Sequence, residues 1–232
     1  MRRVLRPVPI IVPTLSEYTF DAGKTAGCDT QIIEVLDDIQ SGFTRTVNHG
    51  IKCALESERD YICILNDDAY PGDVDWLARM IEAMTGNIGL VGPSGLCRTM
   101  PQAYGVPHMS HAIQQVEQLA FFCVVIKIEV FASIGLLDED FIHYGSDNDF
   151  VMRARKAGWA SVWAPHVYVA HDHKASESKI TREWKKHDQK ILKKRWPSLV
   201  HSPVRGLRRT TGPDRRTARL ALSRFQRQRV GN

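Results

Sequence analysis

The chain has 232 residues, of which 43% are hydrophobic and 25% are charged, a composition typical of a soluble globular protein with one substantial core. No apolar run reaches the roughly 18 to 20 residues that a membrane-spanning helix needs, and the apolar stretch near the N-terminus is too short and too rich in proline for a signal peptide. The five cysteines lack CxxC spacing, which favours free thiols in a reducing compartment over a disulfide framework.

The net charge of +5 is the sum of two parts with opposite sign. Residues from Arg182 onward hold 16 of the 31 Lys/Arg and 3 of the 26 Asp/Glu, so this part carries +13 and residues 1–181 carry −8. An acidic body suits a site that holds a cation, and a basic end suits an anionic partner. Nucleic-acid binders usually interleave aromatic residues with the charge, and residues 202–232 contain only Phe225. We therefore expect an anionic membrane surface rather than nucleic acid as the partner, and a cytoplasmic protein that is free or peripheral at the inner face of the membrane.

Hydrophobic patterning predicts strands that alternate with helices through the first half of the chain. The expected strands are 8–12, 31–36, 61–65, 88–92, 121–128 and one or two short strands within 160–171. The expected helices are 43–57, 76–84, a short helix ending at Gly135, 149–157 and a basic helix over 179–196. Residues 98–118 are predicted to form a loop, and residues 202–232 a flexible Arg-rich tail. This alternation predicts an α/β fold with a mostly parallel sheet covered on both faces.

Three of the predicted strands end in polar or turn residues. These residues are Pro13 and Thr14 after the first strand, Asp37 and Asp38 after the second, and Asn66, Asp67 and Asp68 after the third. Ligands of parallel α/β sheets bind outside the carboxyl ends of the strands, so these ends are expected to line one crevice. Carboxylates there could hold Mg²⁺ or Mn²⁺ and, through it, a phosphate group. The alternative is that the "NDD" turn only shapes the chain before Pro71.

A second acidic cluster occupies residues 136–159. Its members are Asp138, Glu139, Asp140, Asp147 and Asp149. Acids are favoured in the first turn of a helix, which accounts for one of them but not for five. One of these carboxylates, opposite a metal–diphosphate site, could act as a general base on a hydroxyl.

Two histidines close the last predicted strand. His171 and His173 are two residues apart and would share a strand face. One reading is a single imidazole that completes a mainly carboxylate Mn²⁺ or Mg²⁺ site; the other is a surface pair. No cysteine or third histidine has the spacing of a zinc finger.

Taken in order, these segments resemble a family 2 glycosyltransferase with the GT-A fold, in particular its rhamnosyltransferase-like branch. The resemblance covers residues 8 to about 175 and rests on "IIVPT", "IIEVLDD", "GFTRTVNHGI", "YICILNDDAYPGDVDWL", "VFASIGLLDEDFIHYGSDNDFVMRARKAGW" and "WAPHVYVAH". It implies an inverting transferase that uses a nucleotide-diphosphate sugar, most simply a UDP- or dTDP-sugar, with Mn²⁺ or Mg²⁺. The implied acceptor is a hydroxyl of a glycan, a lipid-linked molecule or another compound.

The resemblance also implies roles for individual residues. The implied donor-binding residues are Pro13, Thr14, Asp37, Asp38, Arg45, Asn48, Asn66 and Asp67. Asp68, in the family's DxD motif, and His171 would hold the metal. Asp147, at the acid of the family's Glu-Asp motif, is the expected base, with Asp149 as the alternative.

The chain departs from the family pattern at three points. Asn66 stands at the first position of the DxD motif, Ser146 replaces the glutamate of Glu-Asp, and the segment between Thr14 and Asp38 is short. These departures keep open a degenerate GT-A protein that binds sugar or nucleotide without turnover, and the tail keeps open a nucleic-acid binder. We expect a GT-A domain over 1–178, a basic helix over 179–201 packed on it, and the tail.

Overall fold

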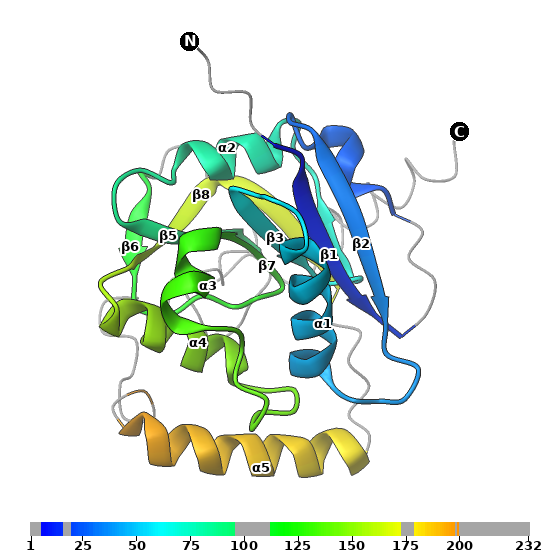
Figure 1. The fold of residues 1–232 in the computed structure, drawn as a ribbon, viewed down its shortest axis with the longest axis vertical. Coiled ribbons are helices and arrows are strands. Elements are labelled where there is room, and N and C mark those ends of the chain that lie inside the picture. The colour runs from blue at the N-terminus through cyan, green and yellow to red at the C-terminus, as the bar shows by residue number, and fades with distance from the viewer. Residues whose placement is uncertain (1–5, 16–19, 96–111, 173–178, 198, 200–232) are drawn as a thin grey trace, which may run out of the picture.

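The computed structural model describes residues 6–15, 20–95, 112–172, 179–197 and 199 (Figure 1). The predicted tail and His173 lie outside these residues. The elements are β1 (Val8–Thr14), η1 (Ala22–Thr25), β2 (Thr30–Leu36), α1 (Phe43–Leu55), β3 (Tyr61–Leu65), β4 (Ala69–Pro71), α2 (Trp76–Glu82), β5 (Ile88–Ser94), β6 (Gln114–Val116), β7 (Cys123–Lys127), α3 (Ile128–Ile134), α4 (Ser146–Lys156), β8 (Ala160–His171) and α5 (Lys179–Arg195).

The strands form one sheet with the order β2-β1-β3-β7-β5-β8-β4, and β6 pairs with β8. Strand β1 is parallel to β2 and β3, and β5 is parallel to β8. Strand β7 runs antiparallel to both β3 and β5, and β4 and β6 run antiparallel to β8. Five strands therefore point the same way, which confirms the α/β fold with a mostly parallel sheet. The carboxyl ends of β1, β3 and β8 lie along the same edge.

Strand β3 shows why the sheet is covered on both faces. Ile62 and Ile64 point into the hydrophobic layer beneath α1, α3 and α4, whereas Cys63 and Leu65 point into the layer beneath α2. All four side chains are fully buried, and burying each large aliphatic one contributes about 1.5–3 kcal/mol. The apolar run at 61–65 thus has a buried neighbour for every side chain, and the chain turns polar where the sheet ends.

Two differences from the sequence expectation bear on the site and its surroundings. Helix α4 begins at Ser146, three residues before the predicted start, which puts Asp147 in its first turn. Part of the predicted loop 98–118 is strand: Gln114–Val116 forms β6 on the edge of β8, while residues 96–111 lie outside the described part of the chain. The polar sequence "QQV" gave no strand signal, because β6 is stabilised by pairing with β8 and not by burial of its own side chains.

Helix α5 lies along the end of the molecule toward which β1 and β2 point (Figure 1). Trp184, Ile191 and Leu192 are half-buried, and Asp188 is fully buried. The helix is therefore held against the body through one face. Among the described helices, none is long and apolar enough to cross a membrane.

Candidate functional site

The acidic turn after β3 lies against the end of β8. Antiparallel pairing places Ala69 of β4 opposite His171 of β8, so the turn that precedes β4 reaches the imidazole. Asp68 Oδ1 lies 3.0 Å and Asn66 Nδ2 3.4 Å from His171 Nε2. The imidazole stacks on Phe122, with 4.9 Å between ring centroids, which fixes its orientation. The two residues expected to hold a metal are thus adjacent in space, although they are far apart in the sequence.

The donor atoms in this turn suit a hard divalent ion. Asp68 offers a carboxylate and His171 an imidazole, and Asn66 Oδ1 is buried without a hydrogen-bond partner among the residues that the structure describes. Oxygen ligands with one imidazole match Mg²⁺ or Mn²⁺. Within the described ranges no group of three or more His, Cys, Asp or Glu side chains is arranged to hold a metal. A bound ion would therefore need oxygens from a phosphate or from water to complete its shell.

Thr14 joins the ends of β1 and β3. The buried Thr14 Oγ1 donates to Asp67 Oδ2 at 2.8 Å, and the Thr14 carbonyl accepts from Asp37 N at 2.9 Å. Pro13 precedes it and is half-buried. The three predicted strand ends therefore meet, because neighbouring parallel strands deliver their carboxyl ends to one place.

The Asp37 carboxylate shapes the loop between β2 and α1. Its oxygens accept from the backbone and hydroxyl of Ser41 at 2.6 and 2.8 Å and from Gly42 N at 2.9 Å. Burial would raise the pKa of Asp37, but these hydrogen bonds outweigh burial and hold the pKa below its usual value. Gly42 has φ 89°, and a Cβ there would lie 2.5 Å from Ile142 O. Asp38 is exposed, so it is the acid of this pair that a ligand reaches without rearranging the loop.

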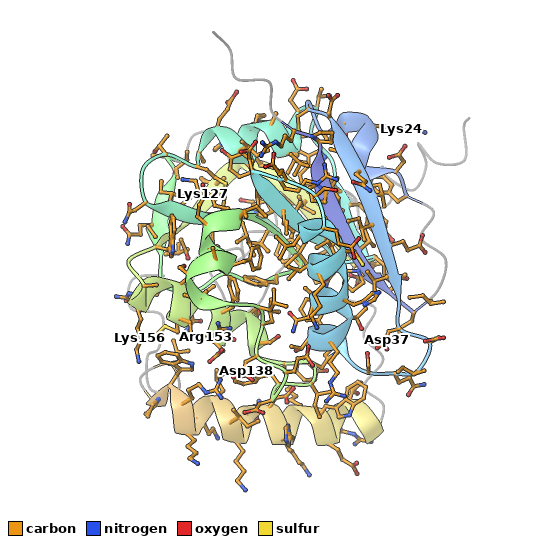
Figure 2. The ribbon with its side chains drawn as sticks, in the orientation of Figure 1. Lys24, Asp37, Lys127, Asp138, Arg153 and Lys156 are labelled. Carbon is orange, nitrogen blue, oxygen red and sulfur yellow. The ribbon has the colours of Figure 1, made fainter. Side chains whose placement is uncertain are left out.

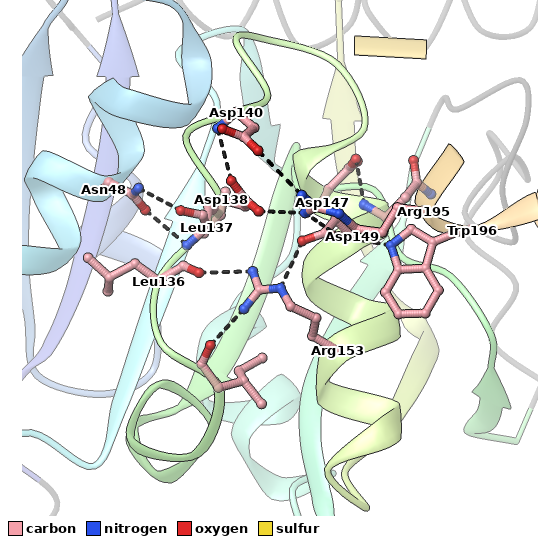
Figure 3. Close-up of polar contacts among 12 residues, drawn as sticks. Asn48, Leu136, Leu137, Asp138, Asp140, Asp147, Asp149, Arg153, Arg195 and Trp196 are labelled. Carbon is pink, nitrogen blue, oxygen red and sulfur yellow. Dashed lines mark hydrogen bonds and ion pairs between the residues drawn. The ribbon is translucent and has the colours of Figure 1, made fainter. Parts of the chain in front are cut away.

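Arg45 and Asn48 face the second acidic cluster rather than the strand ends. Asn48 Nδ2 donates to Leu137 O at 2.8 Å and to Glu139 Oε1 at 3.0 Å, and Leu137 N donates to Asn48 Oδ1 at 3.1 Å (Figure 3). Arg45 is exposed and its Nε lies 3.6 Å from Glu139 Oε2. Asn48 is thus fully used in tying α1 to the segment before α4, which differs from the nucleotide contact expected of it.

Asp147 stands in the first turn of α4 and is partly buried. Its Oδ1 accepts from Asn148 N at 2.8 Å. Burial raises the pKa of Asp147 to about 6, and the backbone N–H groups of Asn148 and Phe121 oppose that rise. Phe121 directly precedes Phe122, whose carbonyl accepts from Asn66 N at 2.8 Å, so Asp147 and the acidic turn both contact the backbone of the 121–122 segment. A carboxyl with a pKa near neutrality suits proton transfer.

Asp149 has a different environment from Asp147. It is fully buried, and its oxygens accept from Arg153 Nε at 2.8 Å, Arg195 Nη1 at 3.1 Å and Trp196 Nε1 at 2.8 Å (Figure 3). Arg153 also donates to the carbonyls of Ile134 and Leu136. A buried carboxylate with three strong donors is held as a structural anion and has no exposed oxygen for an acceptor hydroxyl. Of the two acids, only Asp147 is therefore partly exposed.

Sequence reasoning missed Asp188. This buried carboxylate of α5 accepts from the backbone N–H groups of Ile142, His143 and Tyr144 at 3.0, 2.8 and 2.8 Å. Ile142 O in turn accepts from Thr44 N at the start of α1. Asp188 thereby supports the segment that leads into Asp147. A signal was present, because Asp188 is an acid on the same helix face as Trp184 and Leu192, but the pattern does not say which backbone it contacts.

Comparison with solved structures shows what this arrangement resembles. The chain aligns over 82% of its length with the structure of GalNAc-T7 with UDP, GalNAc and Mn²⁺, at 10% identity and a TM-score of 0.52, covering 51% of that chain. It also aligns over 82% of its length with the mannosyltransferase PcManGT from Pyrobaculum calidifontis in complex with GDP-Man and Mn²⁺, at 14% identity and a TM-score of 0.52, covering 67% of that chain. The chain has the GT-A glycosyltransferase fold.

Sequence comparisons agree with the GT-A fold. The chain is 31% identical over 86 residues to the N-acetylglucosaminyl-diphospho-decaprenol L-rhamnosyltransferase of Mycobacterium tuberculosis, a match that covers 37% of this chain and 28% of that protein. It is 25% identical over 207 residues to the uncharacterized protein y4gI of Sinorhizobium fredii, covering 72% of this chain and 22% of that one. The chain thus spans less than a third of the length of either relative. No protein-family model matches the chain. The similarity to a rhamnosyltransferase is thus confined to part of each chain.

Proposed function

We propose that this protein is an inverting glycosyltransferase that moves a sugar from a nucleotide-diphosphate sugar to an acceptor hydroxyl with the help of Mn²⁺ or Mg²⁺. The observation that supports the proposal is that two features lie beside the same backbone segment, residues 121–122, in a GT-A fold. One is the contact between Asp68 and His171. The other is Asp147, whose pKa is raised to about 6. The proposed transferase domain is 1–178, with the 179–201 helix as its support.

In this proposal Asp147 is the general base. Its carboxylate takes the proton of the acceptor hydroxyl while the hydroxyl oxygen forms a bond to the anomeric carbon. The bond between that carbon and the diphosphate oxygen breaks on the opposite face, so the configuration inverts. The first turn of α4 holds the carboxylate through Asn148 N, and Asp149 orients the same turn from within the protein.

The donor would lie across the ends of β1 and β3. Asp38 would contact the base or ribose, and the linked Thr14–Asp67 pair would border the nucleoside. A Mn²⁺ or Mg²⁺ ion held by Asp68, His171 and the Asn66 amide oxygen would neutralise charge on the departing diphosphate. The proposed donor is a UDP- or dTDP-sugar; the solved GT-A neighbours were obtained with UDP and with GDP-Man.

One observation favours a second candidate, a GT-A protein that binds its ligand without turnover. Asn66 and Ser146 stand where the family pattern has acids, and Ser146 is buried. Either candidate predicts ligand binding, and they differ only in release of the nucleotide.

Nucleotide release from a panel of UDP-, dTDP- and GDP-sugars with Mn²⁺ tests the proposal, using water as the acceptor. We expect slow release from one donor class, lost in Asp68→Ala and in Asp147→Asn. Asp29→Ala is the matched control, because Asp29 is exposed at the opposite end of the sheet. Binding of a donor without release in the wild type would favour the second candidate.

A further inference from the structure

Helix α5 has two faces of opposite character. Asp188 and Trp196 are buried, and Arg195 is half-buried, all directed at the body. The exposed basic residues of the helix are Arg182, Lys185, Lys186, Lys190, Lys193 and Lys194. At 3.6 residues per turn, Lys186, Lys190 and Lys193 fall within about 60° of one another, at the centre of the face opposite Asp188. The seventeen residues of α5 form a cationic strip about 25 Å long.

This strip is held against the body, because α5 is fixed near its middle and at its C-terminal end. Asp188 accepts from three consecutive backbone N–H groups, and Arg195 contacts Asp138, Asp140 and Asp149. Lys186, Lys190 and Lys193 form no ion pair with any other residue in the described part of the chain. In the described part of α5 the only exposed acid is Glu183, so the strip has an excess of positive charge available to an external partner.

We propose that the outer face of α5 is a docking surface for an anionic lipid bilayer. A straight row of lysines matches a flat surface of negative potential, which attracts each cation near it. Trp184 of α5 is half-buried, and Trp196, which directly follows the helix, is buried, so both point inward. The face therefore lacks the stacking side chains that single-stranded nucleic acid needs. The apolar side chains that the structure describes on α5, Trp184, Ile191 and Leu192, are half-buried against the body, so the helix binds by charge and does not insert.

The docked orientation would bring the candidate site near the headgroups. Asp138 and Asp37 both lie at the end of the molecule that carries α5 (Figure 2), and Asp188 contacts the segment that leads into Asp147. A membrane-bound acceptor would therefore reach this end of the sheet first. The docking surface itself is independent of the transfer reaction, because it is defined by the charges of α5 alone.

Vesicle sedimentation with the full chain tests the surface. The comparison is between phosphatidylcholine vesicles with and without phosphatidylglycerol, at low and high salt. The test variant replaces Lys186, Lys190 and Lys193 with glutamine, which keeps helix propensity. The control variant removes the same charge elsewhere through Arg6→Gln, Lys24→Gln and Lys127→Gln; Lys24 and Lys127 lie far from α5 (Figure 2). Circular dichroism confirms that each variant is folded.

We expect wild type to bind only the phosphatidylglycerol vesicles and to be released by salt. The α5 variant should bind at least about tenfold more weakly, and the control variant should change less than about threefold. Equal binding by wild type and the α5 variant, or an equal loss in both variants, would overturn the proposal. A DNA duplex that binds wild type more tightly than the vesicles, with the loss confined to the α5 variant, would assign the surface to nucleic acid instead.

Discussion

Replacing Asp147 with asparagine should stabilise the protein while it removes the base. The pKa of Asp147 is raised from 3.8 to about 6, chiefly by burial. The folded protein therefore holds this proton more tightly than the unfolded chain does. As pH rises from about 4 to 6, the folded state loses that advantage, so the ionised carboxyl lowers the free energy of unfolding above about pH 6. A difference of about two pKa units corresponds to about 3 kcal/mol.

Asparagine has the shape of the protonated acid and no charge, and its side-chain oxygen still accepts from Asn148 N. Above about pH 6 the Asp147→Asn variant should be more stable than wild type by up to about 3 kcal/mol, and near pH 4 the two should differ by less than about 1 kcal/mol. Urea denaturation across this range measures the difference, with Asp29→Asn as an exposed control. An Asp147→Asn variant that is equally stable or less stable at pH 8 would refute the burial argument.

The raised pKa of Asp147 should also determine how the rate of turnover depends on pH. The rate of nucleotide release at low donor concentration should rise about tenfold per pH unit below about pH 6 and level off above it, because Asp147 acts as a base only when it is deprotonated. Buffers of constant ionic strength and metal in excess of donor keep other effects fixed. A rate that is independent of pH through this range would contradict the assignment of Asp147.

Three further variants test the supports of the site. Asp188→Ala leaves three backbone N–H groups without their acceptor and should lower the free energy of unfolding by about 3 kcal/mol or more, measured by urea denaturation. The control Glu183→Ala, at an exposed position of the same helix, should change it by less than about 0.5 kcal/mol. Equal losses in the two variants would mean that α5 is not held through Asp188. Asp149→Asn should lower the free energy of unfolding by about 3–5 kcal/mol, because two arginines lose their buried carboxylate partner. Turnover per folded molecule should persist. A stable but inactive variant would instead make Asp149 the base. Asn48→Ala should cost about 2 kcal/mol and leave the donor Kd unchanged; a weakened Kd at normal stability would restore Asn48 to the nucleotide site.

The sequence predicted the central sheet and the meeting of its polar strand ends, because both follow from local pattern. A run such as Tyr61–Leu65 can only be a strand buried on both faces, and parallel strands bring residues such as Thr14 and Asp67 to one edge whatever the loops between them do. The supports of the site could not be predicted in this way. Asn48, for example, contacts Leu137, which is 89 residues away.

The different environments of Asp147 and Asp149 could not be predicted from the sequence either. Both are acids two residues apart in the first turn of α4, and their sequence context is nearly identical. They differ because the helix turns one carboxylate toward Arg153 and Trp196 in the interior and leaves the other partly exposed at the sheet edge. The contacts of Asp149 with Arg195 and Trp196, which are 46 and 47 residues away, help to distinguish the two, and local sequence does not reveal them.

Calorimetric titration of UDP-, dTDP- and GDP-sugars, with and without Mn²⁺, tests the central claim most directly. We predict that wild type binds one class of donor far more tightly with Mn²⁺ than without it, that Asp68→Ala loses this metal-dependent binding, and that Asp29→Ala keeps it. Folded wild-type protein that binds none of these donors, or that binds one equally well without metal and in Asp68→Ala, would contradict the proposed metal-dependent donor site and leave the "NDD" turn with a structural role alone.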